Sequence, residues 1–297
     1  SQMINFAIPD TGSSGHIGGG ILLAALLGPH AAFLTMASIL LVQALFFGDG
    51  GLLAYGCNVF NMGFFTCFVT FPLFYKMIIR NGFTSKRIFI AATVSAVIGL
   101  QLGAFSVVIE TLLSGKTELP FETFVVLMQP IHLAIGLVEG LVTAAIINFV
   151  WNTRPELLEK AVNGQTIGTI YVTRLLKVFL IAAIVLGGAL SWFASENPDG
   201  LEWSMEKVAG TSELEATGGI HRLFSEIQEK TALLPDYNFK NTQETSTVGK
   251  NEGFWSSINI GTSVSGLLGV ILTCTLAAVI GFIASVLKKR ENVSTSK

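Results

Sequence analysis

The sequence predicts an all-α, polytopic membrane protein, and three observations support this. Apolar residues make up 51% of the 297 positions, charged residues make up 13%, and the mean hydropathy is +0.63. Uncharged runs of about twenty residues, the length that crosses a bilayer core, recur along the chain. The formal net charge of −2 offers no basic surface for nucleic acid. We therefore expect a helical bundle, then a small extracytoplasmic segment and a final transmembrane helix.

The apolar segments are separated by turn signals or by charged connections. Residues 1–8 should be the end of a helix, closed at Pro9, and residues 17–28 should form a short helix. The short helix would rise only about 20 Å, less than the ~30 Å of a bilayer core. The run 121–151 is long for one span, so it should tilt, kink near Pro130 or protrude. The other expected spans are 31–47, 52–75, 88–113, 178–193 and 262–287.

Charged residues orient these spans. The connections after Tyr75 and Trp151 and the C-terminal tail are basic, whereas the segments between them lean acidic. By the positive-inside rule, the C-terminus is cytoplasmic in a multi-pass protein of the cell membrane. The polar stretch of about 195–257 is then extracytoplasmic, where we expect a modest fold or an ordered lid. The basic residues are Lys76, Arg80, Lys86, Arg87, Arg154, Lys160, Arg174, Lys177, Lys288, Lys289 and Arg290.

A single histidine, His16, lies among the glycines and serines of residues 12–20. If the helix behind it is short, His16 lies below the membrane surface on non-helical backbone. Such backbone is tolerated at membrane depth where it is buried in protein or lines a wet cavity. On spacing alone, the favoured interpretation is that the glycines let helices pack closely and His16 is an interior side chain. The alternative is a polar binding site, which the orientation of the spans would open to the outside.

Further polar residues interrupt the apolar runs. His132 and Glu139 are seven positions apart and share one helix face, so they are candidates for a functional role or for interhelical hydrogen bonds. Gly136 and Gly140 on the same helix indicate a close helix contact. We expect Gln43 and Gln101 to form interhelical hydrogen bonds.

Asn58 and Asn61 lie about one turn apart and could face the same crevice as His16. Cys57, Cys67 and Cys274 have unrelated spacings, which indicate neither a disulfide framework nor a zinc site. The sequence has no Walker A motif and no Ser-His-Asp pattern. The residues alone therefore indicate a transport or channel subunit with an outward-facing polar pocket around His16.

Three phrases together resemble the CbiM/NikM family, the substrate-capturing membrane components of energy-coupling-factor transporters for cobalt and nickel. These phrases are residues 12–19, the glycine turn 48–52 with 56–63, and the helix 132–143. The resemblance implies a CbiM/NikM-like membrane domain over 1–177 that lacks its N-terminal start. Pro198-Asp199-Gly200-Leu201-Glu202 and Leu234-Pro235-Asp236-Tyr237 resemble the PDGLE domain, which stands in for the accessory subunit CbiN/NikN. It implies a PDGLE-like region over 178–297 with two flanking transmembrane helices.

In that family the chain's own amino terminus, a histidine at position two and the histidine of the glycine loop hold the ion. Only the last maps onto this sequence, at His16, because the chain begins Ser1-Gln2. The resemblance implies Ni²⁺ or Co²⁺ as the transported substrate, without a catalytic cofactor. Nitrogen-rich tetragonal coordination suits Ni(II), and Cu(II) fits equally well. Asn58, Asn61, His132 and Glu139 are then second-shell or pathway candidates.

The resemblance also implies protein partners. These are a transmembrane coupling subunit of the CbiQ/NikQ type and an ABC ATPase of the CbiO/NikO type, in membrane lipid and without nucleic acid. ATP hydrolysis is expected on those separate subunits. Two alternatives remain open from the residues. One is a membrane-embedded enzyme or assembly factor that uses His16, His132 and Glu139, and the other is a structural membrane subunit with interhelical polar contacts only.

Overall fold

The computed structural model describes residue 2 and residues 5–115, 119–165, 172–211, 218–239 and 260–294. Its longest elements are helices, and one two-stranded hairpin lies near the N-terminus. The strands are β1 (Phe6–Ile8) and β2 (Ser13–Gly15). The helices are α1 (Gly20–Leu27), α2 (Pro29–Val42), η1 (Gln43–Phe47), α3 (Tyr55–Asn58), η2 (Val59–Tyr75), α4 (Lys76–Ile79), α5 (Ser85–Ser114), α6 (Phe121–Thr153), α7 (Pro155–Val162), α8 (Thr173–Gly188), η3 (Leu190–Phe193), α9 (Gly200–Ala209), α10 (Gly219–Thr231), η4 (Pro235–Tyr237) and α11 (Ile260–Ser294).

Five helical stretches of the described chain are long and apolar enough to cross a membrane. They match the expected spans 31–47, 52–75, 88–113, 121–151 and 262–287, so the polytopic helical class is confirmed. The short helix expected at 17–28 is also present as α1. At ~1.5 Å per residue α6 is about 50 Å long, so it must tilt or protrude from the bilayer core. The stretches are Pro29–Phe47, Tyr55–Ile79, Ser85–Ser114, Phe121–Thr153 and Ile260–Leu287.

The prediction of a helix end at residues 1–8 is wrong for residues 6–8, which form β1. The chain reverses after Ile8 through Asp10 (φ 61°) and Gly12 (φ 75°), and both lie in the left-handed region. This turn brings Phe6 opposite Gly15 in an antiparallel pair. The hairpin therefore satisfies backbone polar groups that helical bonds would otherwise satisfy.

The span predicted at 178–193 is shifted toward the N-terminus. The α-helix α8 runs from Thr173 to Gly188, and the tighter turn η3 follows it. The Ser191 hydroxyl donates to the carbonyl of Gly187 at 2.8 Å, and α11 approaches closely at the same place. A Cβ on Gly266 of α11 would lie 2.5 Å from the Gly187 carbonyl oxygen. Small residues thus allow α8 and α11 to pack closely.

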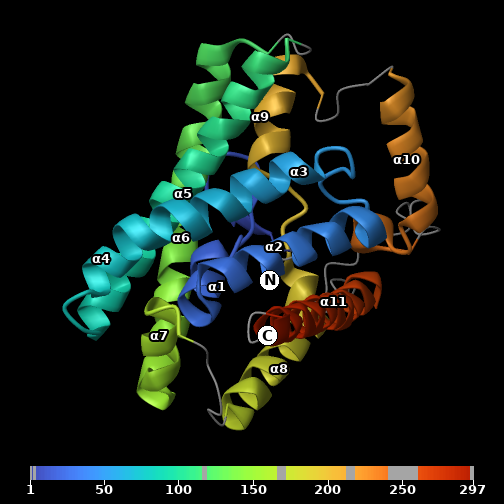
Figure 1. Cartoon of the computed structure of the whole chain (residues 1–297). Coiled ribbons are helices and arrows are strands. Elements are labelled where there is room, and N and C mark those ends of the chain that lie inside the picture. Colours follow the sequence, from blue (N-terminus) through green and yellow to red (C-terminus); the bar gives the residue numbers. More distant parts are fainter. Residues whose placement is uncertain are drawn as a thin grey trace.

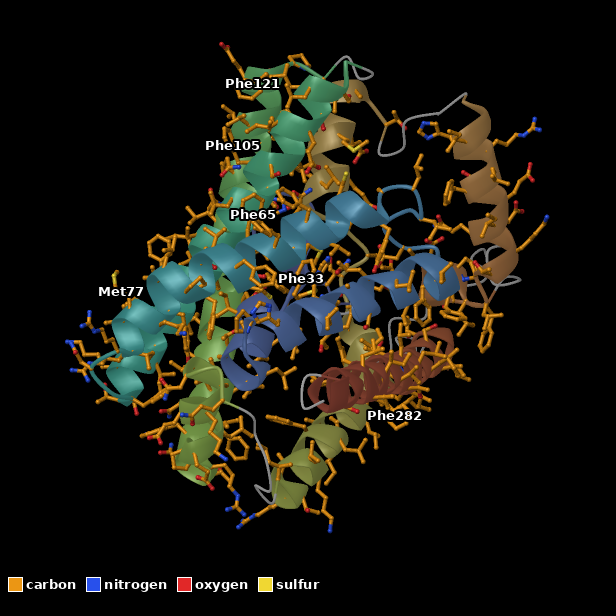
Figure 2. All side chains as sticks on the ribbon, in the orientation of Figure 1. Phe33, Phe65, Met77, Phe105, Phe121 and Phe282 are labelled. Carbon is orange, nitrogen blue, oxygen red and sulfur yellow. The ribbon has the colours of Figure 1, made fainter. Side chains whose placement is uncertain are left out.

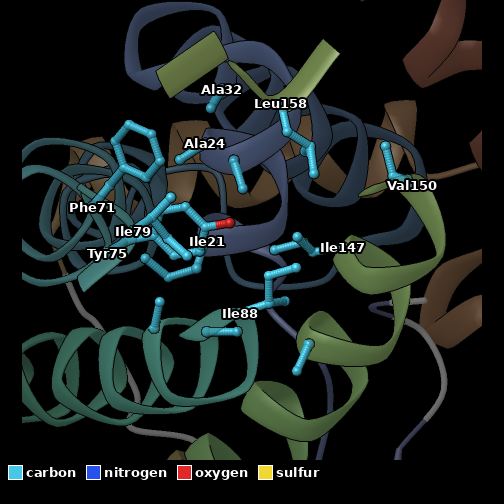
Figure 3. Close-up of a cluster of buried hydrophobic side chains, with 14 of the residues drawn as sticks. Ile21, Ala24, Ala32, Phe71, Tyr75, Ile79, Ile88, Ile147, Val150 and Leu158 are labelled. Atoms are coloured by element: carbon cyan, nitrogen blue, oxygen red, sulfur yellow. The ribbon is translucent and has the colours of Figure 1, made fainter. Parts of the chain in front are cut away.

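The main apolar core joins the helices on both sides of α1 (Figure 3). Ile21 of α1, Ile88 of α5 and Ile147 of α6 are fully buried together. The predicted close contact of Gly136 and Gly140 is confirmed between α6 and α5. A Cβ on Gly136 would lie 2.9 Å from the Cα of Val97, and one on Gly140 would lie 2.5 Å from the Cα of Thr93.

The long helices α5 and α6 run side by side, and α2 and the η2 helix cross in front of them (Figure 1). Helix α9 packs against α6, and α10 contacts the end of the α2–η1 helix. In Figure 1, α9 lies at the top centre and α10 at the upper right, whereas α4 lies at the left and α7 at the lower left. The polar segment and the basic connections are therefore at opposite ends of the bundle.

Candidate functional site

The glycine loop between β2 and α1 fits closely against α6. A side chain at Gly15 would clash with Ile135, so only glycine lets the strand approach this helix. Gly19 adopts φ 80° and is the N-cap of α1. His16 therefore lies on a short loop that is fixed by a strand on one side and by a helix start on the other.

Glu139 anchors this loop from α6. One carboxylate oxygen accepts the backbone N–H of Gly18 at 2.8 Å, and the other accepts that of Gly19 at 3.2 Å. The side chain is only 1% exposed. The first backbone N–H groups of a helix have no partner within it and favour an anion. Glu139 thus holds the loop in place, a role that sequence spacing, which suggested an interhelical contact, did not predict.

A cavity of about 260 Å³ opens beside the loop. It is lined by residues of the glycine loop, of the turn 48–52 (the second glycine turn), of η2, α5 and α6, and of the start of α9. The five residues that the sequence singled out all line it, although they come from three separate stretches of the chain. They are His16, Asn58, Asn61, His132 and Glu139.

The two imidazoles of the cavity differ in their hydrogen bonding. The Nδ1 atom of His16 is buried and has no hydrogen-bond partner. The Nδ1 of His132 lies 2.8 Å from the carbonyl oxygen of Met128, so this nitrogen carries the proton and donates. A histidine that donates one ring N–H to a carbonyl presents the lone pair of its other nitrogen. Both rings can therefore offer a nitrogen to a cation.

The described residues contain no group of three or more His, Cys, Asp or Glu side chains placed to hold a metal ion. His16 and His132 each line the cavity with an imidazole, and Met62, which also lines it, offers a thioether. Cys57, Cys67 and Cys274 are free thiols.

The two asparagines, Asn58 and Asn61, donate hydrogen bonds to different partners. Asn58 donates its amide to the carbonyl of Gly50 at 2.8 Å. Asn61 donates to the Glu110 carboxylate at 3.0 Å, and its own Oδ1 is buried without a partner. Glu110 is absent from the sequence-based candidates. It is the acidic residue inside the expected span 88–113, a signal that could have identified it.

The start of α9 closes one side of the cavity. The backbone N–H of Ser14 donates to the carbonyl of Pro198 at 2.8 Å, and the Ser14 hydroxyl donates to the carbonyl of Asn197 at 2.7 Å. The Trp203 indole donates to the carbonyl of Thr11 at 3.0 Å. Asp199 caps α9, so this segment reaches the cavity with a rigid turn.

The segment around Tyr237 holds a second loop of the same cavity. The Tyr237 hydroxyl donates to the Asp49 carboxylate, and the Gln43 amide donates to Asp49 and to Tyr237, each at 3.1 Å. Gln228 of α10 donates to the carbonyl of Gly48 at 2.7 Å and accepts the backbone N–H of Leu52 at 2.7 Å. Burial and the neighbouring Asp49 raise the pKa of Tyr237 well above its ordinary value, so its hydroxyl stays protonated.

These contacts bear on two earlier expectations. Among its described residues, the polar stretch of about 195–257 forms an ordered cover that is attached to the glycine loop around His16 and to the second glycine turn. The sequence predicted either a modest fold or an ordered lid, and this cover corresponds to the lid. Gln101 donates to the carbonyl of Gln129 at 2.8 Å between α5 and α6, as predicted for an interhelical bond. Gln43 of η1 donates to the Tyr237 hydroxyl of η4, which is also a bond between two helical elements, and in addition to Asp49 of the intervening turn. Its partners became neighbours only through the fold.

Comparison with known proteins adds to this geometry. The family described as "cobalt uptake substrate-specific transmembrane region" (CbiM) matches residues 1–157, and the PDGLE domain matches residues 173–286. A putative fused nickel transport protein NikMN of Archaeoglobus fulgidus is 31% identical over 277 residues, which cover 93% of this chain and 80% of that protein. A putative metal transport protein of Methanocaldococcus jannaschii is 33% identical over 173 residues, with 55% and 75% covered.

A cobalt transport protein CbiM of Sorangium cellulosum is 28% identical over 153 residues, which cover 52% of this chain and 68% of that protein. No solved structure matches the chain.

Proposed function

The chain belongs to the CbiM family of cobalt uptake transmembrane proteins and carries a PDGLE domain, and from this premise we propose that it captures Ni²⁺ or Co²⁺ as the substrate component of an energy-coupling-factor transporter. The resemblance that the glycine phrases and the PDGLE phrases predicted is confirmed. Its relatives are named as cobalt and nickel transport proteins. The transported ion is the substrate, and we propose no catalytic cofactor.

The observation that carries this proposal is the unpartnered Nδ1 of His16 at a cavity wall. A buried polar atom without a partner is costly unless a ligand completes it. Imidazole nitrogen suits Ni²⁺ and Co²⁺, whereas Mg²⁺ prefers an octahedral shell of oxygens. His16 therefore supplies one ligand nitrogen, and Glu139 fixes the loop that presents it. Asn58, Asn61 and His132 serve as second-shell or pathway residues.

A purely structural subunit is less well supported. If the polar residues only joined helices, their hydrogen-bonding atoms would satisfy one another. Gln101 does so, but the Nδ1 of His16 and the Oδ1 of Asn61 are buried beside the cavity without partners. A small cavity lined by such atoms favours a bound polar species.

The proposed orientation places the polar stretch of about 195–257 outside the cell and the C-terminus inside. The basic connections after α4 and after α6 lie at one end of the bundle, and α9 and α10 lie at the other (Figure 1). This separation supports the positive-inside assignment. The ion then enters from the side that α9 and η4 cover.

Uptake against a gradient requires partners that supply energy. We propose that a CbiQ/NikQ-like coupling subunit and a CbiO/NikO-like ATPase assemble with this chain in the membrane. The printed sequence carries no P-loop of its own, which agrees with ATP hydrolysis on another subunit.

The decisive experiment measures equilibrium binding of Ni²⁺ and Co²⁺ to the purified full-length protein by isothermal titration calorimetry. We expect His16→Ala to weaken binding at least tenfold, because a ligand nitrogen is lost from a site that depends on donor count. His221→Ala on the exposed face of α10 is the matched control and should bind as the wild type does. If His16→Ala folds and binds normally, His16 is a packing residue and the proposal is wrong.

A further inference from the structure

A second hollow, of about 820 Å³, lies at the end of the bundle opposite α9 and α10. It forms where the end of η2 and α4 meets the end of α6 and α7. Its walls combine basic, aromatic and aliphatic side chains. They include Leu73, Lys76, Met77, Arg80, Trp151 and Glu159.

Among the described residues, the basic side chains of this groove have no carboxylate partner. Lys76 and Arg80 are four positions apart, so they project from one face of the helix end. Within the described residues neither of them forms an ion pair with a carboxylate. Glu159 also lines the groove but pairs with neither. Two positive charges against one negative charge leave the groove selective for an anion.

The apolar part of the groove continues the surface of a membrane-spanning helix. Leu73 is 58% exposed and Met77 is 62% exposed, and both belong to the span Tyr55–Ile79. Met77 projects from the outer edge of the bundle (Figure 2). Beside it, Phe83 stacks on Trp151 with ring centroids 4.7 Å apart. Aromatic rings are enriched at the depth of lipid headgroups, where one end of a site is apolar and the other is wet.

We propose that this groove binds an anionic phospholipid, with Lys76 and Arg80 on the headgroup phosphate and an acyl chain along Leu73 and Met77. The chemistry of the helix end supports a lipid: the span Tyr55–Ile79 exposes aliphatic surface there, with Lys76 in its last turn and Arg80 directly after it. Basic pockets between transmembrane helices bind anionic headgroups in this way. The proposed orientation places the site in the cytoplasmic leaflet, but the chemistry of the groove is independent of metal capture.

The test reconstitutes the full-length protein with equal amounts of phosphatidylglycerol and phosphatidylcholine and measures the lipids it retains by native mass spectrometry. The wild type should retain phosphatidylglycerol preferentially. Lys76→Gln with Arg80→Gln should weaken this binding about 25-fold, or about fivefold for each removed charge. Lys86→Gln with Lys177→Gln is the matched control, because both lysines are exposed, belong to the basic connections and lie outside the groove. Glu159→Gln should strengthen retention.

Four outcomes would overturn the proposal. The first is that the wild type shows no preference for phosphatidylglycerol, and the second is that both double variants lose it equally, which would indicate general charge attraction. Displacement of the lipid by millimolar inorganic phosphate would indicate a free-anion site. Loss of assembly with a coupling subunit at unchanged lipid retention would indicate a protein-docking surface. Thermal unfolding and Ni²⁺ binding, which should match the wild type in the Lys76 and Arg80 variant, establish that it is folded.

Discussion

Glu139 of α6 accepts the backbone N–H of Gly18 at 2.8 Å, across 121 positions of sequence. This bond fixes the residue two positions after His16 without using a cationic side chain. A buried carboxylate held only by backbone donors is sensitive to substitution, because each oxygen has one defined partner. Much of the candidate site's precision therefore depends on Glu139.

We predict that Glu139→Gln weakens Ni²⁺ or Co²⁺ binding about 10- to 100-fold, as is usual for residues that orient a metal ligand. The amide presents an NH₂ group to one backbone N–H and so loses at least one of the two hydrogen bonds. Calorimetric titration measures the change, and circular dichroism should show unchanged helix content. Glu122→Gln, in the first turn of the same helix, is the control. If Glu139→Gln and Glu122→Gln bind the ion equally well, Glu139 does not orient a metal ligand.

We predict that Tyr237→Phe loosens the cover over the second glycine turn. The variant loses the hydrogen bond to Asp49, which costs about 1–3 kcal/mol because the acceptor is charged. Limited proteolysis should cut near η4 faster, and Ni²⁺ should dissociate faster in stopped-flow exchange. Asp236→Asn, one residue earlier, is the matched control. If Ni²⁺ dissociates from Tyr237→Phe at the wild-type rate, this cover does not control ion release.

The same tyrosine gives a prediction about pH. Burial and Asp49 raise the pKa of Tyr237 well above its ordinary value in the folded protein. The unfolded chain loses this proton near pH 10, so the stabilisation is complete below about pH 10 and declines above it. Between pH 7 and pH 9 the melting temperature of the wild type should exceed that of Tyr237→Phe by a constant difference. At pH 11 this difference should be smaller. A difference that is larger at pH 11 would show that the pKa of Tyr237 is not raised in the folded protein.

We predict that Gly140→Ala destabilises the protein by about 1–3 kcal/mol. The new methyl group would lie 2.5 Å from the Cα of Thr93, and backbone of α5 cannot move aside as a flexible side chain can. Gly281→Ala on α11 is the control, since nothing lies within 4 Å of its new methyl group and alanine favours a helix. Thermal unfolding in detergent compares the two. Equal melting temperatures would show that α5 and α6 do not need this contact.

We predict that α10 is outside the cell. A cysteine at Lys230, in the last turn of α10, should react with an impermeant maleimide in intact cells that carry a cysteine-free background. The native thiols must be replaced, because Cys57 is exposed. A cysteine at Lys86 should react only after lysis. The reverse pattern would invert the whole proposed topology.

Hydropathy predicted most of the fold because long spans must be both apolar and helical. It failed at Phe6–Ile8, where the backbone finds its hydrogen bonds in a hairpin with Ser13–Gly15 and not in a helix. It also misplaced the end of α8, which stops where Gly187 meets Gly266. In both places the outcome depends on a neighbour that sequence periodicity does not encode.

The site divides in the same way. A histidine in a glycine loop and a carboxylate within an apolar run are visible as unusual residues, and the structure brings His16 and Glu139 to one cavity. The hydrogen-bond partners of these residues are not visible in the sequence, because the two bonds to Glu139 cross 121 and 120 positions and the bond from Gln43 to Tyr237 crosses 194. Sequence reasoning could therefore identify candidates but could not assign Glu139 its anchoring role.

The cover and the loops that it touches belong to one polypeptide. Ser14 meets Pro198, and Asp49 meets Tyr237, within the same chain, so closing is a unimolecular step. An intramolecular contact of this kind has an effective concentration that does not depend on the number of copies in the membrane. Stoichiometry between pocket and cover is thus fixed at synthesis. If the cover were a separate protein, it would have to be expressed in an amount that matches the pocket. The fraction of pockets that it covers would then fall as the membrane grows.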